Sequence, residues 1–533
     1  MYVGHFIKEY DFIKNQLFGL ARVELVIGTD RYFKILTNFG KQRDLSMVVL
    51  VLIRIDQDQL ESNRIPNTIQ DVTISFLKAI EIGSIPLSVT KLNMNNNFGL
   101  LKPGIIPNSV TDLFFDRYFL SIPLNVIPSS VDKLRFGELF NVDLEVGCIP
   151  NSVKTLEFGC DYNKFLGVGL LPKSLTCLTF NGDYNCPFRE NVLPIGLSTL
   201  ILNCSFNQYL EPFTLPNTLT KLVFGDSFNR PIEKDVLPTS LSFLKFGKSW
   251  NQNLDFLNGT GDSLRYLELG GDFNKPILSS LPSLTHLVFG SNFNQLIKKS
   301  ILPQSLVHLK FGFQFDQLIM VDSLPNSLQI LKFGHSFNQN IKYPLPTNLK
   351  TLIFGSKFNS LIYKLNDSLN YLEFGTEYNQ TIIPILPSTL EILKFGDNFN
   401  QPFKMQLPKQ LFRLELGSCF NQHIDKGIIP SSCKVLKLYK SSSHKIHIPE
   451  SIIDTILKTK KRKAVDDWGI HLYDNSIGSF SLNQYHYEDS DDENQKQIEW
   501  EQDIESLNEL DEKEMSNQLT YDIHDKYCDE FDY

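Results

Sequence analysis

LPKSLTCLTFNGDYNCPF (171–188) returns with small changes as LPNTLTKLVFGDSFNRPI (215–232) and LPQSLVHLKFGFQFDQLI (302–319). The proline that opens this motif recurs every 21 or 22 residues between Pro107 and Pro430, and two longer intervals each span two motifs. A fixed period of this length is typical of a solenoid, in which every repeat forms one coil and buries its apolar face against its neighbours.

The pattern inside one motif predicts what each coil contains. Side chains alternate between apolar and polar around the second leucine, as in 177–180, which indicates a β-strand. Proline cannot donate a ladder hydrogen bond, so Pro172 marks the entry to the strand. Too few residues remain before the next Leu-Pro pair for a helix. The predicted fold class is therefore a repeat solenoid of the leucine-rich-repeat type, with one parallel β-strand per 21–22-residue coil and little helix.

Two further positions recur after each strand. A glycine, such as Gly312 or Gly334, indicates either a turn with positive φ or a close approach of two backbones. An aromatic residue followed by asparagine comes next, and the aromatic residue is expected to be buried and to stack coil on coil. An amide carries both a donor and an acceptor, so the asparagines are predicted to form an inward-pointing structural ladder rather than a catalytic site. The predicted ladder comprises Asn141, Asn163, Asn185, Asn207, Asn229, Asn251, Asn274, Asn294, Asn338, Asn359, Asn379, Asn400 and Asn421, with Asp316 as the exception.

Composition limits the function classes. The 533 residues carry a net charge of −9, but 488–533 hold 18 Asp/Glu against 3 Lys, so the rest of the chain is at −9 + 15 = +6. This division is not typical of a general nucleic-acid binder. No apolar run could span a membrane, because the longest, 47–53, is far too short. The eight cysteines form no CxxC pair and are expected to be reduced. We expect an intracellular protein, cytoplasmic rather than nuclear.

Four segments are predicted along the chain. Residues 1–60 do not show the repeat clearly and are expected to form an N-terminal cap or a divergent module, with a strand within 45–55. The solenoid is predicted to occupy 61–449 with about 17 coils. A short capping helix with the basic run KTKKRK is expected within 450–470. Residues 471–533 are acidic and expected to be disordered.

The segments FNRPI (228–232), FNKPI (273–277) and FNQPF (399–403) resemble the Phe-Asn-Ile-Pro segment of the FNIP repeat family, a distant relative of leucine-rich repeats. The resemblance covers about 65–450. It implies an interaction scaffold and an origin in social amoebae or in giant viruses that infect them. Some members carry an N-terminal F-box, which implies an alternative role as a substrate-recruiting adaptor of a cullin-type ubiquitin ligase. Residues 12–25 are only a weak match to such a module.

The outward positions of the strands suggest where a protein partner, not identifiable from the sequence, would bind. Four successive coils carry aromatic residues there, and charged residues flank them. The predicted partner-binding residues are Phe243, Tyr266, His286, His308, Lys245, Glu268, Lys310 and Lys332. An aromatic strip rimmed by charge is typical of an interface, although packing between neighbouring coils would also favour aromatic residues.

Motifs that carry chemistry are missing from the sequence. There is no glycine-rich phosphate loop, no Cys/His nucleophile pair and no metal triad, and His286 and His308 have no Cys or carboxylate partner in the pattern. We therefore expect no catalytic residue, no cofactor and no metal, and a non-enzymatic scaffold is favoured over an enzyme.

Overall fold

A computed structural model describes residues 65–74, 79–95, 101–116, 120–203, 205–259, 263–278, 281, 284–381 and 386–438, together with the backbone of three strands within 23–60. All of these residues belong to the first of two structural units, Met1–Asp474. The helix and basic run predicted within 450–470, and the acidic segment 471–533, lie outside the described residues.

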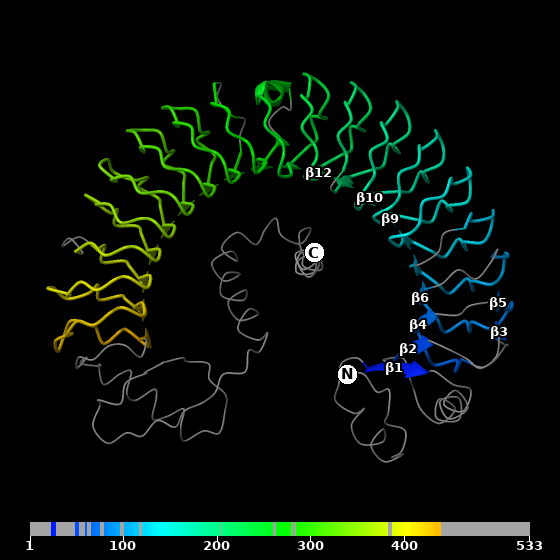
Figure 1. Cartoon of the computed structure of the whole chain (residues 1–533), viewed down its shortest axis with the longest axis horizontal. Coiled ribbons are helices and arrows are strands. Elements are labelled where there is room, and N and C mark those ends of the chain that lie inside the picture. Colours follow the sequence, from blue (N-terminus) through cyan, green and yellow to red (C-terminus); the bar gives the residue numbers. More distant parts are fainter. Residues whose placement is uncertain are drawn as a thin grey trace, which may run out of the picture. The chain divides into compact units, whose positions relative to one another are not determined.

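Almost every coil contributes one short strand (Figure 1). The strands are β1 (Val23–Ile27), β2 (Val48–Leu52), β3 (Gln59–Leu60), β4 (Asp71–Ile74), β5 (Ala79–Ile80), β6 (Lys91–Met94), β7 (Asp112–Phe115), β8 (Lys133–Phe136), β9 (Thr155–Phe158), β10 (Cys177–Phe180), β11 (Thr199–Leu202), β12 (Lys221–Phe224), β13 (Phe243–Lys245), β14 (Tyr266–Glu268), β15 (His286–Val288), β16 (His308–Lys310), β17 (Ile330–Lys332), β18 (Thr351–Ile353), β19 (Tyr371–Glu373), β20 (Ile392–Lys394), β21 (Arg413–Glu415) and β22 (Val435–Lys437). Among the described residues the one helical element is the 3₁₀ helix η1 (Asp255–Gly259), which lies in a coil that lacks the proline.

Twenty of the strands form a single parallel sheet. The pairing runs β1–β2–β4–β6 and then strand by strand to β22, so each coil pairs with the next. Equivalent residues are in register, as in Leu178 with Leu200 and Leu200 with Leu222. The prediction of one parallel strand per coil is confirmed. The strand predicted within 45–55 is β2, whereas β1 was not predicted, and β3 and β5 pair separately.

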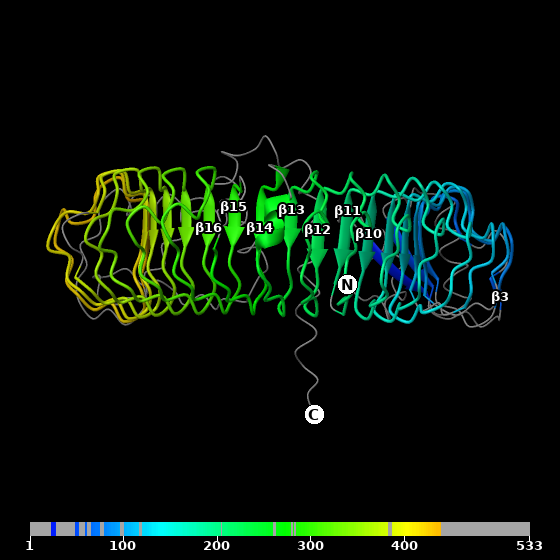
Figure 2. The same cartoon turned by 90° about the horizontal axis from the view of Figure 1, so that it is seen from above.

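The strands β4 and β6–β22 lie along the inner edge of the stacked coils, and the returning segments, with β3 and β5, lie along the outer edge (Figure 1). Seen from above, β10–β16 stand side by side (Figure 2). In β4, β6–β9, β11 and β12 the burial alternates along the strand, with the second residue buried under the sheet and the first and third facing outward. In β10 the third residue, Thr179, is buried as well. The outward residues of successive coils therefore form two rows on one surface, which we call the strand face.

The turn into each strand explains the proline and the Ser/Thr of the motif. The leucine N–H donates to the proline carbonyl, as from Leu175 to Pro172 at 3.1 Å. The hydroxyl beside it donates to a carbonyl of the preceding coil, as from Ser174 to Val153 at 2.7 Å. The same bond recurs in many coils, for example from Ser327 to Leu306 at 2.7 Å. Since each hydroxyl satisfies a backbone acceptor one coil away, these residues connect the coils as well as closing the turn.

Aromatic rings fill the core in two columns. The aromatic residue that ends a strand or directly follows it stacks on the aromatic residue four positions later, as Phe333 does on Phe337 with ring centroids 3.8 Å apart. Rings also stack between coils, as Phe315 does on Phe337 at 6.0 Å. Trp250 occupies the same column and is completely buried. The predicted coil-on-coil stacking is confirmed, and its regularity explains why Phe, Tyr and Trp replace one another there.

The recurrent glycine is explained by close approach of two backbones rather than by positive φ. A Cβ atom on Gly334 would lie 1.8 Å from the carbonyl oxygen of Gly312, and one on Gly312 would lie 1.8 Å from that of Gly290. No real Cβ atom approaches a backbone oxygen so closely. A side chain at this column would therefore separate neighbouring coils, and glycine is required for the coils to stack.

Candidate functional site

The asparagines predicted to form a ladder are connected by one unbroken series of hydrogen bonds. In each coil the side-chain oxygen Oδ1 accepts from the backbone N–H of the equivalent residue in the next coil. The series begins with Asn163 N–H to Asn141 Oδ1 at 3.1 Å and ends with Asn421 N–H to Asn400 Oδ1 at 2.8 Å. It passes through Asn185, Asn207, Asn229, Asn251, Asn274, Asn294, Asp316, Asn338, Asn359 and Asn379.

A second donor, not predicted from the sequence, completes this ladder. The glutamine that often follows the asparagine donates from Nε2 to Oδ1 of the preceding coil, as Gln380 does to Asn359 at 3.0 Å. Each Oδ1 can thus accept two hydrogen bonds and the ladder uses the side chain only as an acceptor. This explains Asp316, because a carboxylate accepts equally well and takes Asn338 N–H at 2.8 Å.

The expected inward direction of the ladder is wrong. The asparagines are half-buried or exposed, and the aromatic residue before each of them is the one that enters the core. The physical reason is that consecutive residues in an extended segment point to opposite sides. The ladder therefore lies at the surface of the coils and holds them together there, which is a structural role.

The aromatic residues of the predicted partner surface are brought together on β13–β16. Phe243, Tyr266, His286 and His308 are direct neighbours in register; we call these four residues the aromatic strip. The rings of Phe243 and Tyr266 are stacked at 4.3 Å with an interplanar angle of 6°. Those of His286 and His308 meet edge to face at 5.4 Å. All four side chains are half-buried, because each packs against the equivalent side chain in the neighbouring coil.

The residues of this strip thus pack between coils and remain partly exposed at the surface. Phe243 and Tyr266 stack in the direction that runs from strand to strand, so their ring edges, not their faces, point away from the sheet. The remaining face of Phe243 is covered by Lys221, whose Nζ lies 5.0 Å from the ring centroid. The Tyr266 hydroxyl donates to Glu268 Oε2 at 2.8 Å, which holds the ring along the strand. Burial and the Glu268 carboxylate raise the pKa of Tyr266, so this hydroxyl remains a donor.

The charged residues of the predicted surface divide into a neutralised pair and an unneutralised pair. Lys245 and Glu268 are register partners and form an ion pair at 3.2 Å. Lys310 and Lys332 are also register partners, on β16 and β17, and we call them the lysine pair. Their outer neighbours in the same row are Val288 and Ile353. Within the described residues neither lysine has a carboxylate at ion-pair distance. Like charges directly opposite each other destabilise a sheet.

The two histidines contribute no positive charge at neutral pH. Burial lowers the pKa of His286, and burial with the charges of His286, Lys332 and Lys310 lowers the pKa of His308 to about 3. His308 Nε2 is buried without a hydrogen-bond partner among the described residues. Thr285 Oγ1 lies 3.0 Å from His286 Nδ1. The positive charge of this region therefore comes from the lysines.

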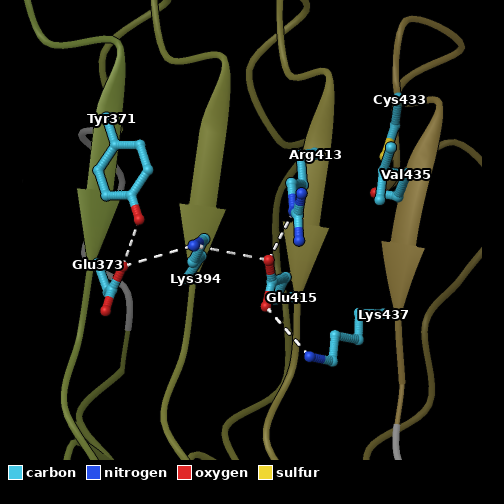
Figure 3. A network of polar contacts seen from close by, with 8 residues as sticks. All are labelled: Tyr371, Glu373, Lys394, Arg413, Glu415, Cys433, Val435 and Lys437. Atoms are coloured by element: carbon cyan, nitrogen blue, oxygen red, sulfur yellow. Dashed lines mark hydrogen bonds and ion pairs between the residues drawn. The ribbon is translucent and has the colours of Figure 1, made fainter. Parts of the chain in front are cut away.

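The strand face on β19–β21 differs, because its charges satisfy one another (Figure 3). Lys394 Nζ lies between Glu373 at 3.7 Å and Glu415 at 3.8 Å. Glu415 also contacts Arg413 Nε at 2.5 Å and Lys437 Nζ at 4.0 Å. This network was not predicted from the sequence, since the alternation of sign becomes visible only when the strands are placed in register. It leaves little uncompensated charge for a ligand.

The described residues offer little chemistry for catalysis or metal binding. Across the described ranges no cluster of three or more His, Cys, Asp or Glu could hold a metal ion. Buried thiols such as Cys148 and Cys433 have a pKa raised to about 11 by burial, so they are protonated and poor nucleophiles at neutral pH. No helix among the described residues has the length and apolar character needed to cross a membrane.

These coils define a parallel β-solenoid of the leucine-rich-repeat type. The model of the family described as FNIP Repeat matches residues 76–118, 120–161, 162–205, 206–249, 280–314, 315–357 and 378–419. More than half of the sequence is thus matched, and the chain belongs to the FNIP repeat family. No curated protein sequence matches it.

Three of the solved structures that resemble the chain illustrate the likeness. The crystal structure of CroV588, described as a novel circular LRR protein and coming from a giant virus, is 35% identical with a TM-score of 0.63. The match covers 76% of this chain and 66% of CroV588, just under two thirds of its length. The TLR13–ssRNA13 complex is 13% identical, with 83% and 77% coverage and a TM-score of 0.45. An internalin, InlF from Listeria monocytogenes, is 15% identical, with 54% and 80% coverage and a TM-score of 0.33.

Proposed function

We propose that this protein is a non-enzymatic scaffold that binds a protein partner along the strand face, centred on β13–β17. The observation that carries the proposal is the coincidence of the aromatic strip with the lysine pair on five adjacent strands. On β9–β12, by contrast, the strand face is composed mainly of Thr, Ile and Val, and on β19–β21 its charges pair with one another. Aromatic residues surrounded by polar ones are typical of binding hot spots.

Several features support a binding rather than a catalytic role. A repeat array presents a long, regular surface built from rigid strands, which suits recognition of an extended partner. The described residues provide neither a metal cluster nor a buried nucleophile with a lowered pKa. The side chains of Phe243 and Tyr266 are fixed by their stacking and by the Tyr266–Glu268 hydrogen bond, so little side-chain entropy would be lost on binding.

The proposal is tested by affinity capture from a lysate of amoeba cells, with captured proteins identified by mass spectrometry. The strand-face variant is Phe243→Ala/Tyr266→Ala. A matched control, Phe165→Ala/Tyr209→Ala, removes two aromatic side chains that are 62% and 55% exposed and lie outside the strands. We expect a partner that is captured by the wild type and by the control but lost from the strand-face variant.

Folding is checked by circular dichroism, and Lys310→Glu gives a second variant that removes no packing. A partner that is retained by both strand-face variants would contradict the proposed location. Loss from the control variant alone would move the site to the returning segments.

The adaptor role is a second proposal, supported by the family resemblance rather than by geometry, because 1–22 lie outside the described residues. Co-capture of a Skp1-type protein and a cullin, lost on deletion of 1–45, would favour it. We also propose an intracellular, cytoplasmic location, supported by the free thiols of Cys148, Cys177, Cys186, Cys419 and Cys433. Fluorescence microscopy of the tagged chain in host cells tests it, and a secreted or nuclear signal would contradict it.

A further inference from the structure

The distribution of charge along the strand face indicates what kind of partner it fits. From β15 to β18 the two outward rows contain His286, Val288, His308, Lys310, Ile330, Lys332, Thr351 and Ile353. Not one of these eight residues is acidic, and the nearest carboxylates in the same row, on Glu268 and Glu373, already pair with Lys245 and Lys394. A sheet that otherwise places opposite charges in register thus leaves two ammonium groups side by side, next to a buried imidazole nitrogen without a partner.

The aromatic strip adds to the same preference. An aromatic ring is negative on its faces and positive at its edge. Phe243 and Tyr266 cover each other's faces and turn their edges outward. The surface presented to a partner is therefore edge-positive on β13–β14 and carries the ammonium groups on β16–β17. Both features attract carboxylate oxygens. The faces of Phe243 and Tyr266 are occupied by each other, by Lys221 and by His286, which disfavours stacking of a nucleobase on them.

We propose that β13–β17 bind an acidic, extended peptide segment of a partner protein, whose carboxylates neutralise Lys310 and Lys332. This inference rests on the proposed function and specifies the chemistry of its partner. Four strand spacings of about 4.8 Å give a track on the order of 19 Å, which an extended segment of about six residues spans at ~3.3 Å per residue. The segment crosses the strands, with its carboxylates towards β16–β17 and its apolar groups over the aromatic strip.

The test is selection of phage-displayed random dodecapeptides on the immobilised full chain, followed by affinity measurement of one selected peptide by fluorescence anisotropy. Four proteins are compared, namely the wild type, Lys310→Gln/Lys332→Gln, Phe243→Ala/Tyr266→Ala, and the control Lys342→Gln/Lys364→Gln. The control removes two exposed lysines from adjacent coils outside the strands, so its change in net charge is identical. A random single-stranded RNA pool is selected in parallel on the wild type.

We expect peptides rich in Asp and Glu from the wild type and the control, and an affinity at least tenfold lower for the lysine-pair variant. Enrichment of neutral or basic peptides that still require Phe243 and Tyr266 would overturn the acidic preference while leaving the proposed scaffold intact. Equal affinity for the lysine-pair and control variants would also overturn it. Selection of RNA in place of peptides would overturn the proposal that the partner is a protein. Peptides whose affinity is unchanged by every strand-face variant would contradict the proposed function itself.

Discussion

The substitution Asn359→Ala tests whether the asparagine ladder holds the coils together. Asn359 Oδ1 accepts Asn379 N–H at 2.9 Å and Gln380 Nε2 at 3.0 Å. Each hydrogen bond contributes about 0.5–1.5 kcal/mol, so losing both costs ~1–3 kcal/mol. Because Asn359 is half-buried, water can replace part of the lost hydrogen bonding, and we expect a destabilisation in the lower half of this range. Asn359→Asp keeps the acceptor and should cost under ~0.5 kcal/mol, as Asp316 already occupies this column.

A long repeat array can unfold in parts, so a local measurement is needed. Hydrogen exchange followed by mass spectrometry reports the opening of 371–381 directly. A loss of ~1–2 kcal/mol corresponds to exchange that is about 5–30-fold faster for Asn359→Ala. Exchange unchanged in Asn359→Ala, or equally accelerated in Asn359→Asp, would refute the reasoning that the side chain acts as an acceptor.

Three further changes are predicted to alter stability. Gly334→Ala places a Cβ atom 1.8 Å from the Gly312 oxygen and should destabilise by more than ~3 kcal/mol, whereas Gly167→Ala, with open space around it, should change the melting temperature little; equal effects would contradict the close-approach argument. The pKa of His308 is lowered to about 3, so the unfolded chain binds more protons between about pH 6.5 and 3, and stability should fall as pH falls through this window by up to ~1.4 kcal/mol per pH unit. His308→Leu should flatten this dependence in denaturation curves, and an unchanged slope would contradict it. Phe213 is 82% exposed with φ of 66°, so Phe213→Gly should stabilise by about 1 kcal/mol in thermal unfolding, and a lower melting temperature would argue against strain there.

The fold could be predicted because every coil repeats the same physical requirements. Leu178, Phe180 and Tyr184 are buried as their spacing indicates, since alternation along a strand fixes which side chains lie beneath the sheet. The sequence did not decide whether the recurrent glycine serves a positive φ or a close approach of two backbones, because sequence spacing does not show how near the carbonyl of the neighbouring coil lies. Only the stacking of the coils, in which a Cβ atom on Gly334 would meet the Gly312 oxygen, distinguishes the two explanations.

The candidate site was less accessible to sequence reasoning. The aromatic strip could be identified, because in-register coils bring equivalent positions together. The absence of a partner for Lys310 and Lys332 could not, since it depends on which side chains reach across two or three strands. The inward direction assigned to the asparagines failed for a related reason, because the aromatic residue before each one determines which side of the chain is buried. The signal for the second ladder donor was present in the recurring Asn-Gln pair.

The central claim, that the partner lies on β13–β17, is tested most directly by site-specific photo-crosslinking. A benzophenone amino acid is placed at Val288, in the middle of the strand face, and separately at Tyr363, which is 53% exposed in a returning segment. The account predicts that Val288 forms a crosslink to the captured partner and that the crosslink maps to an acidic segment, while Tyr363 forms none. A crosslink from Tyr363 without one from Val288 would contradict the account.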